Sequence, residues 1–85
     1  MMSFGEIVKE QRQVRGWVLR ELKEALGAQV GECYLLKIER HDAIPSKKVI
    51  ESIAKLFKLD VNKLFEIAIE TKVKVYRDSL EKKYY

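Results

Sequence analysis

The chain has 85 residues, of which 47% are hydrophobic and 35% charged, with a net charge of +4. This length predicts a single domain with one core, and the composition, with 4 Gly and 1 Pro, excludes a disordered chain and a many-stranded sandwich. The apolar runs reach only about three or four residues, against the ~20 of a membrane span, and no signal-like apolar region follows the start. We therefore expect a soluble, cytoplasmic, all-α protein.

The distribution of charge and cysteine restricts the compartment and the partners. Cys33 is the single cysteine, so no internal disulfide can form. Residues 1–45 carry seven basic and seven acidic side chains, whereas residues 46–85 carry ten and six. The pI near 9.2 permits binding to nucleic acid, although interspersed Lys and Glu are also typical of soluble helical proteins.

The first part of the chain predicts two amphipathic helices. Ser3 and Glu6 have the spacing of a capping box, and apolar residues then follow at helical period, which predicts a helix over 4–15. Gly16 suits the left-handed position after the end of that helix. The second helix is predicted over 18–26, with an apolar stripe of Leu19, Leu22 and Leu26.

After a short turn, two more helices are predicted on either side of a loop that contains the proline. Residues 32–40 resume the helical period, with Leu35 and Ile38 facing inward. The segment HDAIPS is predicted to be a loop, because a proline disfavours helix at the residue before it. Ser46 is a good N-cap for the next helix, predicted over 47–58 with a broad apolar face.

The C-terminal segment has two interpretations. Asp60 caps a fifth helix, but beyond Thr71 the sequence KVKVYR alternates as a strand does. Apolar residues at three- and four-residue spacing instead favour a helix extended to about residue 82, and we predict this helix because a lone strand would have no partner in the chain. Its apolar stripe either folds back on the domain or pairs with a second copy. We predict pairing, through Ile69, Val73, Tyr76 and Leu80.

The second predicted helix ends in a glycine, and after a turn the third predicted helix runs into the sequence KIER. This arrangement resembles the phage-repressor/Cro-type (XRE-type) helix-turn-helix DNA-binding family. The resemblance covers about residues 4–65, and its most specific part is Y-L-x-K-I-E-R followed by P-S in the next loop. It implies a five-helix, lambda-repressor-like domain over residues 1–70, with residues 71–85 as a helical C-terminal extension.

This resemblance also implies a function, namely a sequence-specific transcriptional regulator that binds double-stranded DNA as a homodimer and represses by occupying a promoter. In the family, the third helix enters the major groove and the second lies across the backbone. Carried over by position, the groove-facing residues are Gln29, Glu32, Cys33, Tyr34 and Lys37. The phosphate contacts fall to Arg12, Arg20, Lys37, Arg40, Lys47 and Lys48.

Three features depart from the family pattern and leave a second hypothesis open. Val18 and Leu19 replace the polar pair that commonly opens the second helix, and the turn AQVGECY is about two residues longer than usual. The groove-facing set contains the acidic Glu32 and no arginine, although arginine to guanine is the commonest specific contact. The alternative is a protein-interaction module, an antitoxin or adaptor, in which Val18, Leu19, Tyr34 and Leu36 meet a partner.

Several side chains of the third predicted helix have two interpretations. Tyr34 either contacts DNA or covers the edge of the core as an amphipathic ring. Lys37 either contacts a phosphate or is solvated, and Leu36 either covers the core or meets a partner. Glu39 is expected to pair within the fold.

The sequence offers no catalytic, metal or cofactor site. Cys33 and His41 are eight positions apart, about 12 Å along a helix, which is too far for a nucleophile–base pair. They also lack the further ligands that a zinc site needs, and no glycine-rich phosphate loop is present. We expect no enzyme activity, no cofactor and no small-molecule ligand, and we interpret Cys33 as inert rather than as a redox switch.

Overall fold

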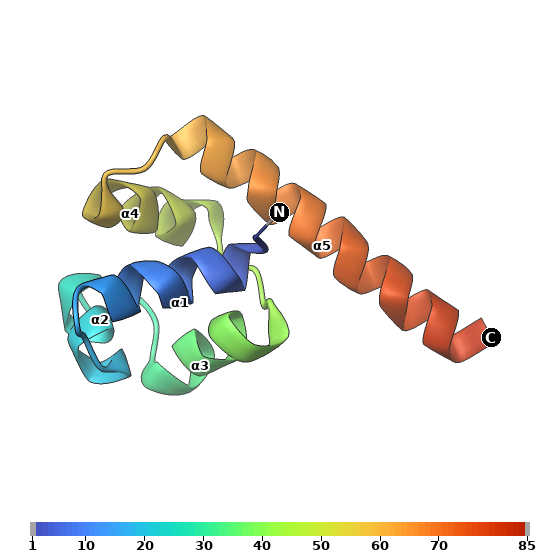
Figure 1. The fold of residues 1–85 in the computed structure, drawn as a ribbon, viewed down its shortest axis with the longest axis horizontal. Helices are drawn as coiled ribbons and strands as arrows, with labels where there is room; N and C mark the ends of the chain where they lie inside the picture. The colour runs from blue at the N-terminus through green and yellow to red at the C-terminus, as the bar shows by residue number, and fades with distance from the viewer. Residues whose placement is uncertain (1, 85) are drawn as a thin grey trace.

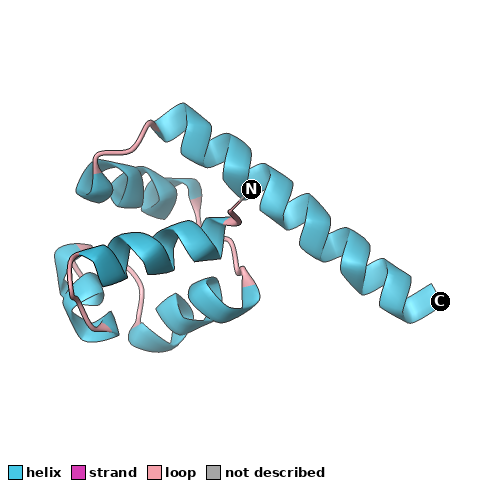
Figure 2. Ribbon diagram, viewed as in Figure 1, coloured by secondary structure: helices cyan, strands magenta, loops and turns pink. Residues whose placement is uncertain are grey.

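The computed structural model describes residues 2–84, and this part of the chain forms five α-helices without any strand (Figures 1 and 2). The helices are α1 (Phe4–Val14), α2 (Leu19–Ala25), α3 (Glu32–His41), α4 (Lys47–Phe57) and α5 (Val61–Tyr84). The predicted all-α class is confirmed, and each predicted helix is present with ends that differ by about two residues or less. None of the described helices combines the length and the apolar character that crossing a bilayer would require.

The helix ends form as the local sequence predicts. The Ser3 hydroxyl accepts a hydrogen bond from the Glu6 amide at 3.3 Å, and the Glu6 carboxylate accepts one from the Ser3 amide at 3.2 Å. Two hydrogen bonds with Ser3, the larger effect coming from its backbone and the smaller from its side chain, stabilise the charged carboxylate of Glu6. They hold the pKa of Glu6 below its ordinary value. After α1, Gly16 has a φ of +68°, a left-handed conformation that glycine adopts without strain.

One hydrophobic core joins the helices. In Figure 1, α1 crosses the middle of the molecule, with α3 on one side and α4 on the other. Contacts between elements link α1 to α3 and α5, α2 to α3, and α4 to α5. The largest side chains that are fully buried in this core are Phe4, Val8, Leu22, Leu35, Ile38, Ile53 and Leu64.

Helices α1 and α3 approach each other closely at Gly5. A Cβ atom at this position would lie 2.1 Å from the carbonyl oxygen of Ile38 and 2.7 Å from Oδ1 of Asp42. The Gly5 amide donates a hydrogen bond to the same Oδ1 at 3.0 Å. The absence of a side chain at Gly5 therefore sets how α3 lies against the start of α1.

Helix α5 begins in the core and leaves it halfway along its length. Its inner face carries Leu64, Ala68 and Thr71, all buried, and the Thr71 hydroxyl accepts a hydrogen bond from the Phe4 amide at 3.0 Å. Residues 72–83 are exposed, and Figure 1 shows this half extending beyond the other helices. The prediction of a helix rather than a strand is confirmed, and the segment does not fold back on the domain.

Candidate functional site

Helix α3 has an inner and an outer face with different chemistry. Leu35 and Ile38 on the inner face are fully buried against the other helices. On the opposite side lie exposed residues that are three or four positions from Lys37, which places them on one side of the helix. We call this set the outer line of α3, and it consists of Cys33, Lys37, Arg40 and His41. It contains basic side chains and no acid.

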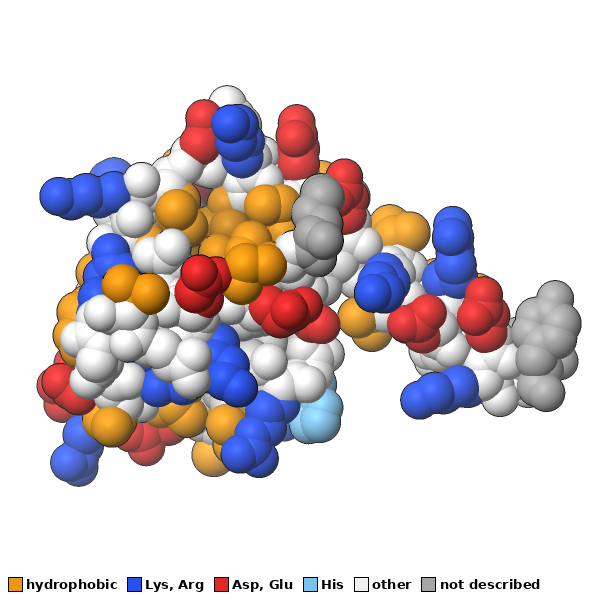
Figure 3. Space-filling view, viewed as in Figure 1, with side chains coloured by type: hydrophobic (Ala, Val, Ile, Leu, Met, Phe, Trp, Pro, Cys, Tyr) orange, Lys and Arg blue, Asp and Glu red, His pale blue; other side chains and the backbone are white. Residues whose placement is uncertain are grey.

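The outer line includes one residue that sequence reasoning had placed in a loop. His41 is the last residue of α3 and is exposed next to Arg40. The four-residue spacing from Cys33 through Lys37 was the signal that could have revealed it. Figure 3 shows basic side chains and the histidine together at the edge of the molecule that α3 occupies.

An ion pair holds α3 to α1 from behind. Nε and Nη2 of Arg12 donate to the two carboxylate oxygens of Glu39 at 2.8 and 2.9 Å, and Nη1 donates to the Trp17 carbonyl at 2.7 Å. The side chains of Arg12 and Glu39 are only 16% and 3% exposed. The hydrogen bonds that Arg12 donates to Glu39 raise the pKa of Arg12 above its ordinary value. The expectation that Glu39 pairs within the fold is confirmed.

The geometry of Arg12 corrects its predicted role as a phosphate contact. All three of its nitrogen atoms are engaged inside the molecule, and the guanidinium faces the back of α3 rather than solvent. A charge-assisted, two-point pair of this kind is stronger than an ordinary hydrogen bond. Arg12 therefore positions α3 instead of belonging to its outer line.

Two further residues that were predicted to face the groove form hydrogen bonds within the fold. Nε2 of Gln29 donates to the Leu26 carbonyl and to the Ser52 hydroxyl, both at 2.9 Å, which ties the turn to α4. The Tyr34 hydroxyl donates to the Ile44 carbonyl at 3.2 Å, so its ring lies across the loop after α3. Tyr34 remains 36% exposed, at the edge of the outer line.

The other predicted contact residues surround α3. Glu32 opens α3 and is exposed, as are Arg20 in the first turn of α2 and Lys48 at the start of α4. Lys47 is exposed too, but its ammonium lies 5.8 Å from the centroid of the Phe65 ring, which directs it toward α5. Glu32 is the one acidic side chain among these predicted contacts, and its negative charge would repel a phosphate.

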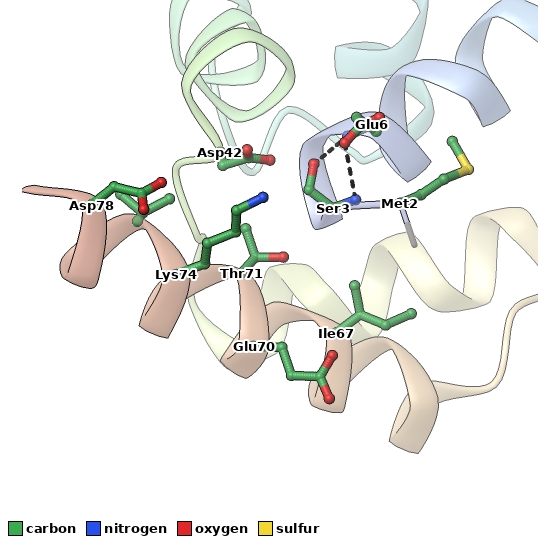
Figure 4. Close-up of a pocket in the computed structure, with 10 residues that line it drawn as sticks. Met2, Ser3, Glu6, Asp42, Ile67, Glu70, Thr71, Lys74 and Asp78 are labelled. Atoms are coloured by element: carbon green, nitrogen blue, oxygen red, sulfur yellow. Dashed lines mark hydrogen bonds between the residues drawn. The ribbon is translucent and has the colours of Figure 1, made fainter.

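A groove of about 470 Å³ at the junction of α5 with the start of the chain is a different kind of surface. Its charged lining consists of the carboxylates of Glu6, Asp42, Glu70 and Asp78 together with Lys74. Figure 4 shows Lys74 reaching from α5 into the groove on the side of Asp42. Because carboxylates outnumber cations there, the groove repels phosphate and does not compete with α3 as a nucleic-acid site.

The outer line presents exposed side chains, two of which, Lys37 and Arg40, are cationic. Within residues 2–84, no three His, Cys, Asp or Glu side chains come close enough together to hold a metal ion. Comparison with protein-family models, curated proteins and solved structures finds no match to this chain. The candidate site is defined by the geometry of α3.

Proposed function

We propose that this chain is a sequence-specific regulator of transcription that binds double-stranded DNA as a homodimer. In this proposal, α2 and α3 form the helix-turn-helix pair, the outer line of α3 lies in the major groove, and occupation of a promoter represses transcription. The observation that carries the proposal is the division of α3 into a buried inner face and an exposed, basic, acid-free outer line.

The charges of the outer line suit a DNA groove. The major groove is about 12 Å wide and admits an α-helix, so a helix needs one free side to enter it. Lys37 and Arg40 on that side supply cations for phosphate oxygens, and Arg40 has the paired donors that match the edge of guanine. The set predicted to face the groove contained no arginine, whereas the outer line does.

The support behind α3 favours recognition by a rigid helix. The Arg12–Glu39 pair and the close approach at Gly5 fix α3 against α1, so its outer line is presented without an ordering cost at binding. The α3 N-cap is Gly31, which has no side-chain acceptor for the first-turn amides. The free N–H groups of this first turn form the positive end of the helix dipole, which attracts a phosphate of the DNA.

The test is fluorescence anisotropy with labelled genomic fragments at two salt concentrations. Replacing one phosphate contact, as in Lys37→Ala, is expected to lower the slope of log affinity against log salt by about 0.9. Arg40→Ala is expected to weaken binding to a selected site by roughly 5- to 100-fold. Lys63→Ala is the control, because it removes the same charge from the first turn of α5, which lies at the other end of the molecule from α3 (Figure 1).

Two outcomes overturn this assignment. If Lys37→Ala and Arg40→Ala bind as Lys63→Ala does, the outer line of α3 does not contact DNA. If the unaltered chain binds no fragment even at low salt, DNA is not the ligand.

A second candidate function, a protein-interaction module on the same fold, is favoured by one observation. Val18 is the N-cap of α2, lacks a side-chain oxygen for the cap, and is 57% exposed. Leu19 and Leu36, which the sequence offered as further contacts, are half-buried. This proposal predicts that DNA binding is absent or insensitive to Lys37→Ala, so the same titration separates the two functions.

A further inference from the structure

Helix α5 carries, from Ile69 onward, an apolar stripe that nothing in its own domain covers. Ile69, Val73, Tyr76 and Leu80 are 64%, 52%, 66% and 38% exposed. They follow one another at spacings of four, three and four residues, which is the pattern of a coiled-coil seam. At about 100° per residue, the stripe lies roughly 140° around the helix from the inner face defined by Leu64, Ala68 and Thr71.

We propose that this stripe packs against the same stripe of a second copy, with the two α5 helices antiparallel. The inference deepens the proposed function, because it gives the surface and the orientation of the homodimer on which that function rests. It is independent of DNA binding itself. The stripe faces away from the domain, and Figure 1 shows the second half of α5 projecting clear of the other four helices, so a second helix has access.

The charges beside the stripe favour the antiparallel orientation. In a parallel pair, the flanking residues five positions apart meet, which places Lys72 of each copy against Arg77 of the other. In an antiparallel pair centred between Val73 and Tyr76, Glu70 of each copy instead meets Arg77 of the other. Lys72 then faces the uncharged Ser79. The parallel pair has two repulsive contacts, and the antiparallel pair has two attractive ones. Glu70 and Arg77 form no ion pair with any described residue of their own chain.

The sizes of the stripe residues favour the same orientation. An antiparallel pair places the large Tyr76 of one copy opposite the small Val73 of the other, and Ile69 opposite Leu80. A parallel pair stacks Tyr76 on Tyr76 and Val73 on Val73, which leaves one layer crowded and the next underfilled. Even filling of successive layers is what a packed seam requires.

The length of the stripe sets the expected strength of the dimer. From Ile69 to Leu80 the helix rises about 16 Å, so the seam is short. Its four side chains per copy fall below the ~800 Å² per partner of a standard interface, and the dimer is expected to dissociate reversibly rather than to be permanent. The experiments below are therefore made over a range of protein concentrations.

Cysteine cross-linking distinguishes the orientations, and all variants carry Cys33→Ser to remove the native thiol. In the antiparallel pair, residue 69 of one copy is next to residue 80 of the other, whereas two copies of residue 69 are about 16 Å apart along the axis. A disulfide needs Cα atoms within about 7 Å. We expect Ile69→Cys mixed with Leu80→Cys to form the mixed disulfide, and each variant alone to stay largely monomeric on non-reducing gels.

A control variant measures random collision between thiols. Lys82→Cys places the thiol on the opposite side of the same helix from the stripe and stays exposed. The proposal is overturned if the mixed pair cross-links no faster than this control. It is also overturned if Ile69→Cys cross-links faster with itself than with Leu80→Cys.

A charge reversal provides a second measurement, whose sign depends on orientation. Arg77→Glu brings like charges together in the antiparallel pair, so the dimer is expected to weaken by roughly tenfold in sedimentation equilibrium. In a parallel pair the same change faces Lys72 and strengthens the dimer. The double variant Glu70→Arg with Arg77→Glu is expected to restore dimerisation, and a tighter dimer of Arg77→Glu alone contradicts the antiparallel orientation.

These results separate this inference from the proposed function. The expected cross-linking pattern combined with unchanged DNA affinity for Lys37→Ala leaves the dimer standing and removes the DNA-binding role. A monomer at every concentration, combined with DNA binding that Lys37→Ala reduces, overturns the dimer and leaves the binding surface of α3 in place.

Discussion

The replacement Gly5→Ala tests the arrangement that presents α3. The added Cβ would lie 2.1 Å from the Ile38 carbonyl oxygen and 2.7 Å from Oδ1 of Asp42. Both contacts are shorter than side-chain carbons tolerate, and the closer one is to backbone, which cannot rotate away. Helices α1 and α3 must therefore separate by about 1 Å, as close-packed interiors transmit such strain.

The expected cost follows from three contributions. Overpacking costs about 1–3 kcal/mol and more where the obstacle is rigid, and a weakened hydrogen bond from Gly5 to Asp42 adds about 1 kcal/mol. The better helix propensity of alanine offsets about 0.5–1 kcal/mol. The net loss in the free energy of unfolding is about 2–4 kcal/mol, a large share of the ~5–10 kcal/mol of a domain this size.

Urea unfolding followed by circular dichroism at 222 nm measures this loss, and a thermal scan is expected to show a midpoint lower by roughly 10–25 °C. Gly31→Ala is the matched control, because a Cβ there meets nothing within 4 Å and the backbone φ is −82°. That variant is expected to lose less than about 1 kcal/mol. Equal stability of the two variants would refute the close approach of α1 and α3 at Gly5.

The remaining predictions concern single interactions. Glu39→Gln removes the charge that faces Arg12 in a poorly exposed pair, and urea titration is expected to show a loss of about 2–4 kcal/mol; a loss below about 0.5 kcal/mol would contradict the buried geometry. The pKa of Glu6 is lower in the folded chain than in the unfolded one. The charged carboxylate therefore adds to the free energy of unfolding above the unfolded pKa, and this stabilisation is lost as pH falls through the folded pKa. The urea midpoint of the unaltered chain is therefore expected to exceed that of Glu6→Gln at pH 7 and to approach it near pH 3, and a difference independent of pH would count against the capping box. Ala28 has a φ of +57°, so Ala28→Gly is expected to raise the free energy of unfolding by about 0.5–1 kcal/mol in the same assay, and a decrease would show that the turn has another conformation.

The helices were predictable because their signals are local. The capping box of Ser3, the glycine after α1 and the N-cap at Ser46 each act within about four residues, and the structure forms all three. The segment after Thr71 was ambiguous because alternation and helical spacing coexist in it. Within one helix the backbone groups of this segment pair with one another, apart from the carbonyls of the last turn, and they need no second strand, which decides for the helix.

The side chains of the candidate site were less predictable because their partners are distant in sequence. Arg12 pairs with a carboxylate 27 residues away, Gln29 with a hydroxyl 23 residues away, and Tyr34 with a carbonyl ten residues away. Position in the chain assigned each of these residues to a DNA contact, but only the packing of the helices shows where they point. Lys37 and Arg40 needed no such partner, so their exposure followed from the period of α3 alone.

The separation of roles between the two sides of α3 has a consequence for engineering. The side chains that hold this helix in the molecule include those of Leu35, Ile38 and Glu39, whereas the side chains at positions 33, 37 and 40 are exposed and form no hydrogen bond or ion pair with residues 2–84. Substitutions at these three solvent-facing positions therefore leave the free energy of unfolding nearly unchanged. A library randomised there retains a common scaffold, so differences in the ligands that its members select report side-chain chemistry alone.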